Sequence, residues 1–302
     1  MLYHYTSLEA FLNILKSKQL WLVSSLTMDD KTDRFYGNLF CLASLLKSNH
    51  TDAKLLRSRL KAKDILDINV DTLSVNFYSA SFCERHNNKK LWEDYADNFR
   101  GVCFEFNENC LFDYEGELIK EKYRPLDDED KPRNPIVIEN RKVEYGESEH
   151  LFEKILEDMK RFCAIDEDAM TNDKANLQFR NWLELMLITV AGVVKSNDFK
   201  DEEEIRLLFQ DRYDDEFITA HPFYVLNEYN YAEVIKILGV SKKIEQPKKH
   251  VNLELNKIFS SILIPKVFVT ADFELNDELR KALNDAGLYE TEIGQVNKDE
   301  IY

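Results

Sequence analysis

The sequence predicts an α+β fold, and three observations support this prediction. The β-rich runs are short, as at residues 2–5, 75–83 and 102–106. They are spaced irregularly and mixed with amphipathic helices, whereas a doubly wound fold alternates strands and helices strictly. No internal repeat or low-complexity linker divides the chain. We therefore expect one α+β domain over residues 1–302, with the core motifs in 2–210 and C-terminal strands and a helix, 225–295, packing on the same core.

The first elements follow from local patterns. Residues 2–5 are expected to form a short buried strand, after which Thr6 or Ser7 caps a helix. That helix carries an apolar stripe at helical spacing, made of Leu8, Phe11, Leu12 and Leu15. Residues 19–23 predict a second strand. A core helix over 36–46 and a charged surface helix over 52–66 are expected to follow.

The middle and end of the chain repeat this mixture. Residues 75–83 predict a central strand, and 89–98 predict a helix with Leu91, Trp92 and Tyr95 on one face. Gly101 ends that helix, and the alternation of 102–106 is typical of a strand. The further expected elements are strands at 118–123, 143–145 and 204–209 and helices at 149–163, 178–194 and 277–286.

Composition excludes several classes of function. The net charge is −16, which opposes the phosphate backbone of nucleic acids. Only 8 glycines occur, without a G-x-G-x-x-G or G-x-x-x-x-G-K string, so a glycine-rich phosphate loop is not expected. The 5 cysteines form no C-x-x-C pair, which favours a reducing compartment. With no secretory leader and no run of about 18 apolar residues, we expect a cytoplasmic protein without a membrane partner.

The strand Tyr3-His4-Tyr5-Thr6 is the first candidate site segment. Neighbouring residues of a strand alternate between its two faces, so His4 and Thr6 share one face and Tyr3 and Tyr5 the other. The polar pair could hold a ribose hydroxyl or a phosphate. The alternative is a core histidine beside tyrosines that favour strands.

The second candidate segment combines Ser79 and Ser81 with Trp92 and Tyr95. The two hydroxyls point to one face of the predicted strand, and the two aromatic rings lie three residues apart on the predicted helix. Such rings stack on flat ligands. The alternative is core packing and helix capping. Cys83 with His86, three residues apart, has no partner in the sequence that would make it a nucleophile and base.

The third candidate segment holds Glu202, Glu204 and Arg206, which strand alternation places on one face. Two nearby carboxylates raise at least one pKa, and an arginine can hold one carboxylate ionised. The alternative is a solvated acidic turn. A weaker candidate is a metal site at Asp29, Asp30 and Asp33, which lacks the spacing of a calcium loop.

Taken together and in order, these segments resemble the domain of unknown function 2971 family of bacterial proteins. The matching positions are Tyr3-His4-Tyr5-Thr6, Leu20-Trp21-Leu22, Met28-Asp29-Asp30, Ser81-Phe82-Cys83, Leu91, Trp92, Tyr95, Ala96, Gly101-Val102-Cys103, Phe199, Glu202, Glu204 and Arg206. That family resembles, more distantly, ADP-ribosyltransferase-like folds, which implies a split mixed and antiparallel sheet surrounded by helices.

The resemblance implies an NAD-dependent ADP-ribosyltransferase or NAD glycohydrolase, as a toxin or antiphage-defence effector. NAD would be the substrate, and no metal is expected. Glu204 and His4 would be catalytic, with His4 holding the ribose across a cleft from Glu204. The substrate-binding residues would be Tyr3, Tyr5, Thr6, Ser79, Ser81, Trp92, Tyr95, Glu202 and Arg206. The acceptor, whether water, a protein or a nucleic acid, and any partner protein of a defence system stay open.

Two alternatives remain. One is a non-catalytic module that binds a nucleotide or a protein through the same residues. The other is a metal-dependent nuclease site formed by Asp29, Asp30 and Glu202.

Overall fold

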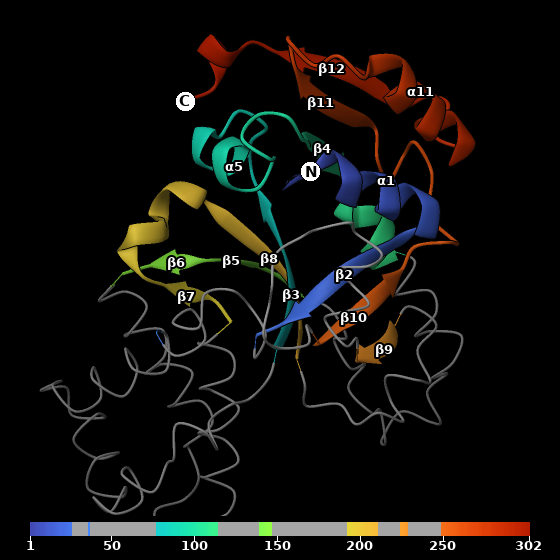
Figure 1. Cartoon of the computed structure of the whole chain (residues 1–302). Helices are drawn as coiled ribbons and strands as arrows, with labels where there is room; N and C mark the ends of the chain where they lie inside the picture. Colours follow the sequence, from blue (N-terminus) through green and yellow to red (C-terminus); the bar gives the residue numbers. More distant parts are fainter. Residues whose placement is uncertain (26–35, 37–76, 114–138, 147–191, 211–223, 229–248) are drawn as a thin grey trace, which may run out of the picture.

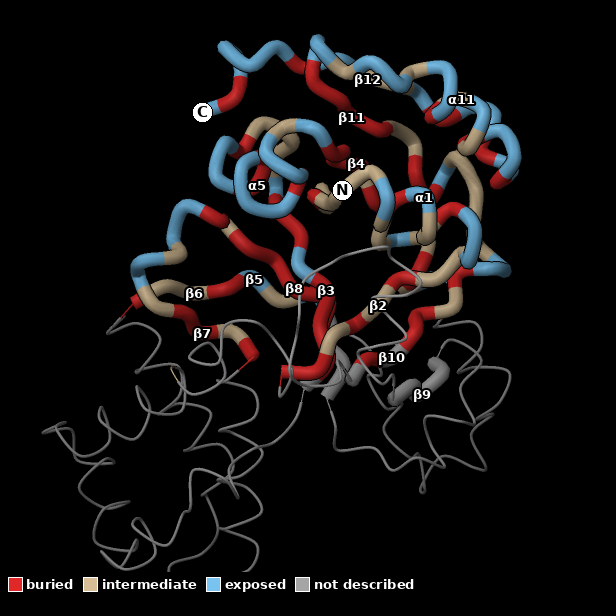
Figure 2. Tube along the Cα trace, viewed as in Figure 1, coloured by how far each residue is buried: buried red, intermediate tan, exposed pale blue. Residues whose placement is uncertain are grey.

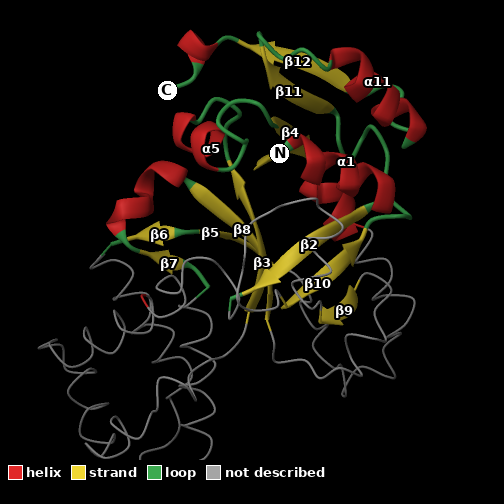
Figure 3. Ribbon diagram, viewed as in Figure 1, coloured by secondary structure: helices red, strands yellow, loops and turns green. Residues whose placement is uncertain are grey.

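The computed structural model describes residues 1–25, 36, 77–113, 139–146, 192–210, 224–228 and 249–302. Within these residues the fold is α+β, as predicted: helices pack beside a mixed sheet (Figure 1, Figure 3). The helices predicted over 36–46, 52–66, 149–163 and most of 178–194, the strand predicted over 118–123 and the acidic loop at Asp29, Asp30 and Asp33 lie outside the described residues. No helix among the described residues is long and apolar enough to cross a membrane.

The described part of the main sheet has ten strands in the order β12-β11-β4-β1-β3-β2-β10-β9, with β8 on β3 and β5 on β8. All pairs are antiparallel except β11 with β12. Its strands are β1 (Leu2–Thr6), β2 (Gln19–Ser24), β3 (Phe77–Cys83), β4 (Val102–Phe106), β5 (Glu139–Lys142), β8 (Glu204–Gln210), β9 (Tyr224–Glu228), β10 (Lys249–Glu254), β11 (Lys266–Thr270) and β12 (Glu292–Val296). A separate parallel pair joins β6 (Glu144–Tyr145) to β7 (Val194–Lys195).

The sheet forks at β3. One edge of β3 pairs with β8 along its whole length, from Phe77 opposite Gln210 to Cys83 opposite Glu204. Its other edge is shared, because β2 pairs at Ser79 whereas β1 pairs at Cys83. The strands β1 and β2 therefore separate beside Ser81, which lies between the two points of pairing.

The helices begin and end for local reasons. In α1 (Leu8–Ser17) the Ser7 side chain caps the N-terminus by accepting from the Ala10 amide. Leu12, predicted in the buried stripe, is 37% exposed. The helix α5 (Lys89–Asp94) is shorter than predicted, because three successive residues after it have positive φ: Asp97, Asn98 and Phe99. The remaining helices are η2 (Asn197–Glu202), α11 (Asn276–Asp285) and η3 (Lys298–Glu300).

Strand register assigns the side chains of the sheet to two faces. Direct partners share a face, so Tyr3, Tyr5, Cys83 and Ser81 lie on one face, called here the Ser81 face. The other, the His4 face, carries Leu2, His4, Phe82 and Phe104 and packs with Phe11 and Leu15 of α1. Near β1 and β4 the Ser81 face is covered by Leu91 and Trp92 of α5. In Figure 2 the strands β3, β10 and β11 are coloured mostly as buried.

Candidate functional site

The candidate site is centred on Ser81, which lies on the central strand β3 and is exposed. Arg206 of β8 is directly opposite Ser81, and Glu204 is opposite Cys83, so all three side chains share the Ser81 face. The Ser81 hydroxyl donates a hydrogen bond to Oε1 of Glu204 over 2.5 Å. The hydroxyl of an exposed residue is thereby joined to Glu204, which is 3% exposed.

Glu204 is held by two cations. Arg206 donates from Nε to Oε1 at 2.8 Å and from Nη2 to Oε2 at 3.0 Å. Lys195 Nζ lies 3.0 Å from Oε2, and the Glu204 amide donates to the Tyr145 hydroxyl at 2.7 Å. Burial alone would raise the pKa of Glu204, but the charges of Arg206 and Lys195 outweigh it and lower that pKa to about 2. Glu204 is therefore ionised at neutral pH.

Glu202 belongs to the same cluster, but it comes from a 3-10 helix and not from the predicted strand. It ends the 3-10 helix η2, and the left-handed Glu203, with φ 49°, separates it from β8. Its Oε2 accepts from Lys195 at 2.8 Å and its Oε1 from Tyr95 at 3.2 Å. The expectation that strand alternation aligns Glu202 with Glu204 is wrong. The expected rise of a carboxylate pKa is also not found at Glu204, because the charges of Arg206 and then Lys195 lower that pKa.

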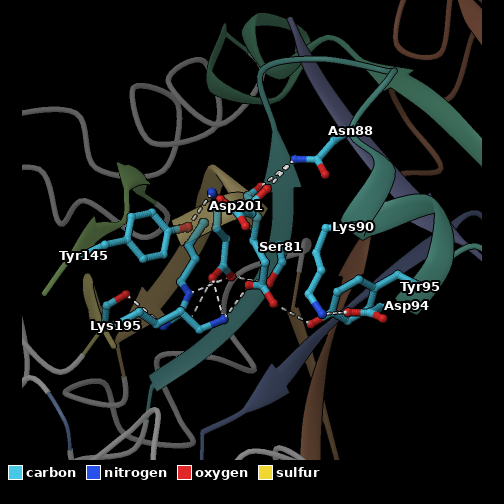
Figure 4. A network of polar contacts seen from close by, with 12 residues as sticks. Ser81, Asn88, Lys90, Asp94, Tyr95, Tyr145, Lys195 and Asp201 are labelled. Carbon is cyan, nitrogen blue, oxygen red and sulfur yellow. Dashed lines mark hydrogen bonds and ion pairs between the residues drawn. The ribbon is translucent and has the colours of Figure 1, made fainter. Parts of the chain in front are cut away.

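Tyr95 and Trp92 do not form the expected stacking pair. Trp92 is fully buried, and its Nε1 donates to the His86 carbonyl at 2.8 Å. Tyr95 instead caps the C-terminus of α5, is 50% exposed and points its hydroxyl at Glu202 (Figure 4). Burial and the Glu202 charge raise the pKa of the Tyr95 phenol, so it remains a neutral donor at neutral pH. Only Tyr95 of the two presents a ring near Ser81.

His4 lies on the opposite face of the sheet from the Glu204 side chain. Its ring packs between Phe82 and Phe104, with both centroid distances 5.2 Å. Burial lowers the pKa of His4, so the ring is neutral at neutral pH. Nδ1 is 2.8 Å from the Ser81 carbonyl, and because a carbonyl only accepts, Nδ1 carries the proton. His4 therefore meets the site through the backbone of Ser81 at the fork, and not across a cleft from Glu204.

The other predicted residues of β1 serve mainly to tie elements together. The Tyr5 hydroxyl donates to the Arg85 carbonyl at 2.7 Å and accepts from the Asn88 amide at 3.1 Å. The Tyr3 hydroxyl donates to Glu105 at 3.2 Å, and burial raises its pKa to about 12. Thr6 follows His4 on the His4 face by strand alternation. The structure thus groups Ser81, Tyr95, Glu202, Glu204 and Arg206. The hydroxyls of Tyr3 and Tyr5, on the same face, bond to Glu105 and the Arg85 carbonyl instead.

Three residues of the site were not predicted as such. Lys195 is 6% exposed and joins both carboxylates, Tyr145 holds the Glu204 amide, and Asn88 donates to the Asp201 carbonyl at 2.7 Å. Figure 4 shows Tyr145 on one side of this cluster and Tyr95 on the other. The sequence contained one signal, a lysine directly after the apolar run 188–194, nine residues before Glu204. Tyr145 and Asn88 depend on tertiary contacts that no local pattern indicates.

The metal-site alternative gains no support from the described part of the chain. There, no group of three or more His, Cys, Asp or Glu side chains is arranged to hold a metal ion. Glu202, which that alternative requires, pairs with Lys195. Asp29 and Asp30 lie outside the described residues.

Comparison with known proteins gives one match. The model of the family described as "Protein of unknown function (DUF2971)" matches residues 91–207. No match was found among curated proteins or among solved structures. The matched interval contains Tyr95, Lys195, Glu202, Glu204 and Arg206, whereas His4 and Ser81 lie before it. Over the segment that supplies both carboxylates and both cations of the site, the chain is similar to the DUF2971 family.

Proposed function

We propose that this protein cleaves the nicotinamide–ribose bond of NAD, as an ADP-ribosyltransferase or an NAD glycohydrolase. The observation that carries the proposal is that Ser81, an exposed residue, donates a hydrogen bond through its hydroxyl to the buried and ionised Glu204. The order of the segments, with a histidine on the first strand, serines on a central strand and a late E-x-E pair, supports the same activity through the resemblance described above.

The reaction suits a fixed negative charge. The C1′–N bond breaks with its electron pair going to nicotinamide, which leaves as a neutral molecule, and the ribose passes through an oxocarbenium-like state. Water or an acceptor nucleophile then bonds to C1′ and loses its proton to solvent. Preorganised charge near the developing cation lowers the barrier. The leaving group needs no proton, so the site needs no general acid.

Glu204 is suited to electrostatic work and not to proton transfer. With a pKa of about 2 it is a weak base at neutral pH. In the proposed mechanism the Ser81 hydroxyl donates to Glu204 and accepts from a ribose hydroxyl, so Ser81 touches substrate and Glu204 acts through it. Tyr95, half-exposed on the far side of Glu202, lines the nicotinamide end.

His4 has a positioning role in this proposal. Its Nδ1 donates to the Ser81 carbonyl at the point where β1 and β2 separate. That carbonyl, on the fork side of β3, otherwise faces a break in strand pairing. His4 thus fixes the backbone that carries the Ser81 hydroxyl.

The test is release of nicotinamide from NAD by the purified protein, measured by mass spectrometry with and without cell extract as a source of acceptors. Loss of one preorganised hydrogen bond at a developing charge costs about 100-fold in kcat, so Ser81→Ala should reduce release to that extent. Ser17→Ala removes a hydroxyl that bonds only near its own helix, to the Asn13 carbonyl and the Gln19 amide, and should leave release unchanged.

Equal rates for wild type and Ser81→Ala, or no release by wild type in either condition, would refute the proposal. If the protein acts as a toxin or an antiphage-defence effector, its expression in cells should also lower the cellular NAD concentration. Expression of the Ser81→Ala variant should leave that concentration unchanged.

A non-catalytic nucleotide-binding module is the second candidate, and one observation favours it. A carboxylate has about four acceptor positions, and those of Glu204 are filled by Ser81 and Arg206 at Oε1 and by Arg206 and Lys195 at Oε2. If the protein is such a module, calorimetry should detect NAD binding, and no nicotinamide should be released.

A further inference from the structure

We infer that the Ser81 face of β2, β3 and β10 holds a nucleobase subsite, which takes a planar ring bearing an –NH2 group. That the ligand is a nucleotide rests on the proposed function. The position of the subsite rests on the geometry described next. In Figure 1, β2 and β10 run side by side next to β3.

The residues of the subsite form two rows across the sheet. In the first row Val23 of β2 lies opposite both Ser79 of β3 and His250 of β10. In the second row Trp21 lies opposite Asn252. Directly paired residues share a face, so these side chains lie on the same face as Ser81. The leucines of the alternate positions, Leu20, Leu22 and Leu253, belong to the core of the His4 face.

Two polar atoms in these rows are buried without a partner. Ser79 and Asn252 are 3% and 5% exposed. Neither Ser79 Oγ nor Asn252 Oδ1, both in the described part of the chain, has a hydrogen-bond partner. Buried polar atoms in native proteins are nearly always paired, because an unpaired one destabilises the fold. Two of them on one face, one row apart, indicate a bound group that supplies hydrogen-bond donors.

An aromatic surface accompanies these atoms. The ring of Trp21 stacks on that of His250 with a centroid distance of 4.2 Å and an interplanar angle of 22°. Trp21 and Val23 beside it are partly exposed, whereas Ser79, His250 and Asn252 are buried. Aromatic rings beside a few fixed polar groups are the usual lining of sites for flat ligands.

The chemistry of the ligand follows from these groups. Asn252 Oδ1 can only accept, and Ser79 Oγ can accept, so the ligand must donate hydrogen bonds. The Trp21 ring favours a flat ligand, and the N–H groups of a base are donors of this kind. The 6-amino group of adenine and the carboxamide of nicotinamide both meet this requirement. Ser79 is two residues from Ser81 on β3, and β10 lies two strand spacings, about 10 Å, from β3. One nucleotide can therefore contact Ser81 with its ribose and this strip with its base.

The experiment compares two ligand pairs, in each of which one member bears the –NH2 group and the other an oxygen in its place, by calorimetric titration of the full chain. AMP is compared with IMP, and nicotinamide mononucleotide with nicotinic acid mononucleotide. We expect the amino or amide member of one pair to bind at least 10-fold more tightly than its analogue, and the pair that discriminates identifies the base. Ser79→Ala and Asn252→Leu should each reduce that preference to about 2-fold or less.

A matched pair of variants separates binding from folding. Ser79→Ala removes a hydroxyl without a partner, so its Tm should equal or exceed that of wild type. Thr270→Val removes a buried hydroxyl that donates to the Phe99 carbonyl at 3.0 Å, so its Tm should fall while the base preference stays.

Equal affinity within both ligand pairs, absence of binding, or a preference that survives both Ser79→Ala and Asn252→Leu would overturn the inference. Because AMP and IMP carry no nicotinamide–ribose bond, a base preference within that pair without nicotinamide release from NAD would refute the proposed reaction and leave the subsite standing. Turnover without a base preference would refute the subsite and leave the proposed reaction standing.

Discussion

Glu204 is buried and held by the charges of Arg206 and Lys195, and this predicts how stability depends on pH. Its pKa falls from 4.5 to about 2 on folding. A depressed pKa in the folded state contributes stability above the unfolded pKa, and that contribution is lost as pH falls from about 4.5 towards 2. The loss is about 3 kcal/mol in the free energy of unfolding. About 2 kcal/mol of it is lost by pH 3, and urea unfolding at pH 7, 4.5 and 3 measures that part.

The matched control for this pH dependence is Glu204→Gln, which lacks the titrating group but keeps the shape. Its unfolding free energy should be lower than that of wild type at pH 7 and should change less between pH 4.5 and 3. Curves for the two proteins that run parallel over this interval would contradict the assignment of the shift to Glu204.

At the residue scale, the sequence predicts which side chains share a strand but not which strands face each other. Alternation correctly separates Tyr3 and Tyr5 from His4. Tyr3 lies opposite Cys83, so the pairing joins residues that are 80 positions apart in the chain. This register determines on which face of the sheet the His4 side chain lies relative to Ser81. No local pattern encodes that register. For this reason His4 was expected opposite Glu204 and is found on the other face.

At the scale of elements, the turn after α5 fixes how close this helix lies to β1. An added Cβ at Gly101 would lie 2.3 Å from the Thr6 carbonyl oxygen and 2.9 Å from the Ala96 backbone. Backbone atoms cannot move aside as a flexible side chain does, so Gly101→Ala should cost about 3 kcal/mol in the free energy of unfolding. Chemical denaturation followed by tryptophan fluorescence measures this loss.

Gly287→Ala is the comparison for that substitution. Gly287 has φ of 88° but no atom within 4 Å of an added Cβ, so only the left-handed backbone cost of about 1 kcal/mol applies. If Gly101→Ala proved no more destabilising than Gly287→Ala, the close approach of α5 and β1 would not be a feature of the protein.

The elements themselves were largely predictable. The strand predicted over 102–106 is β4, and those predicted over 2–5, 19–23 and 204–209 differ from β1, β2 and β8 by one residue. The helix predicted over 89–98 ends at Asp94, because Asp97, Asn98 and Phe99 adopt left-handed backbone. Tertiary packing overrides propensity there: the Gly101 amide bonds to the Ala96 carbonyl and closes the turn. Val194, predicted to end a helix, lies in β7.

At the scale of the molecule, the fork at β3 brings together segments that are far apart in the chain. Residues 2–6, 77–83 and 204–210 meet at Ser81, and 249–254 extends the same face through β2. The α+β class followed from the spacing of short strands. The order of the strands did not, because it is decided by pairings between distant segments. Those pairings also determine that Ser81, and not His4, presents its side chain beside Glu204.

A crystal structure of the protein with a non-cleavable NAD analogue tests the role of Ser81. We predict that a hydroxyl of the nicotinamide ribose lies within hydrogen-bonding distance of Ser81 Oγ, on the Ser81 face, with the base over the strip of Trp21 and Asn252. An analogue bound on the His4 face, or bound without contact to Ser81, would contradict it.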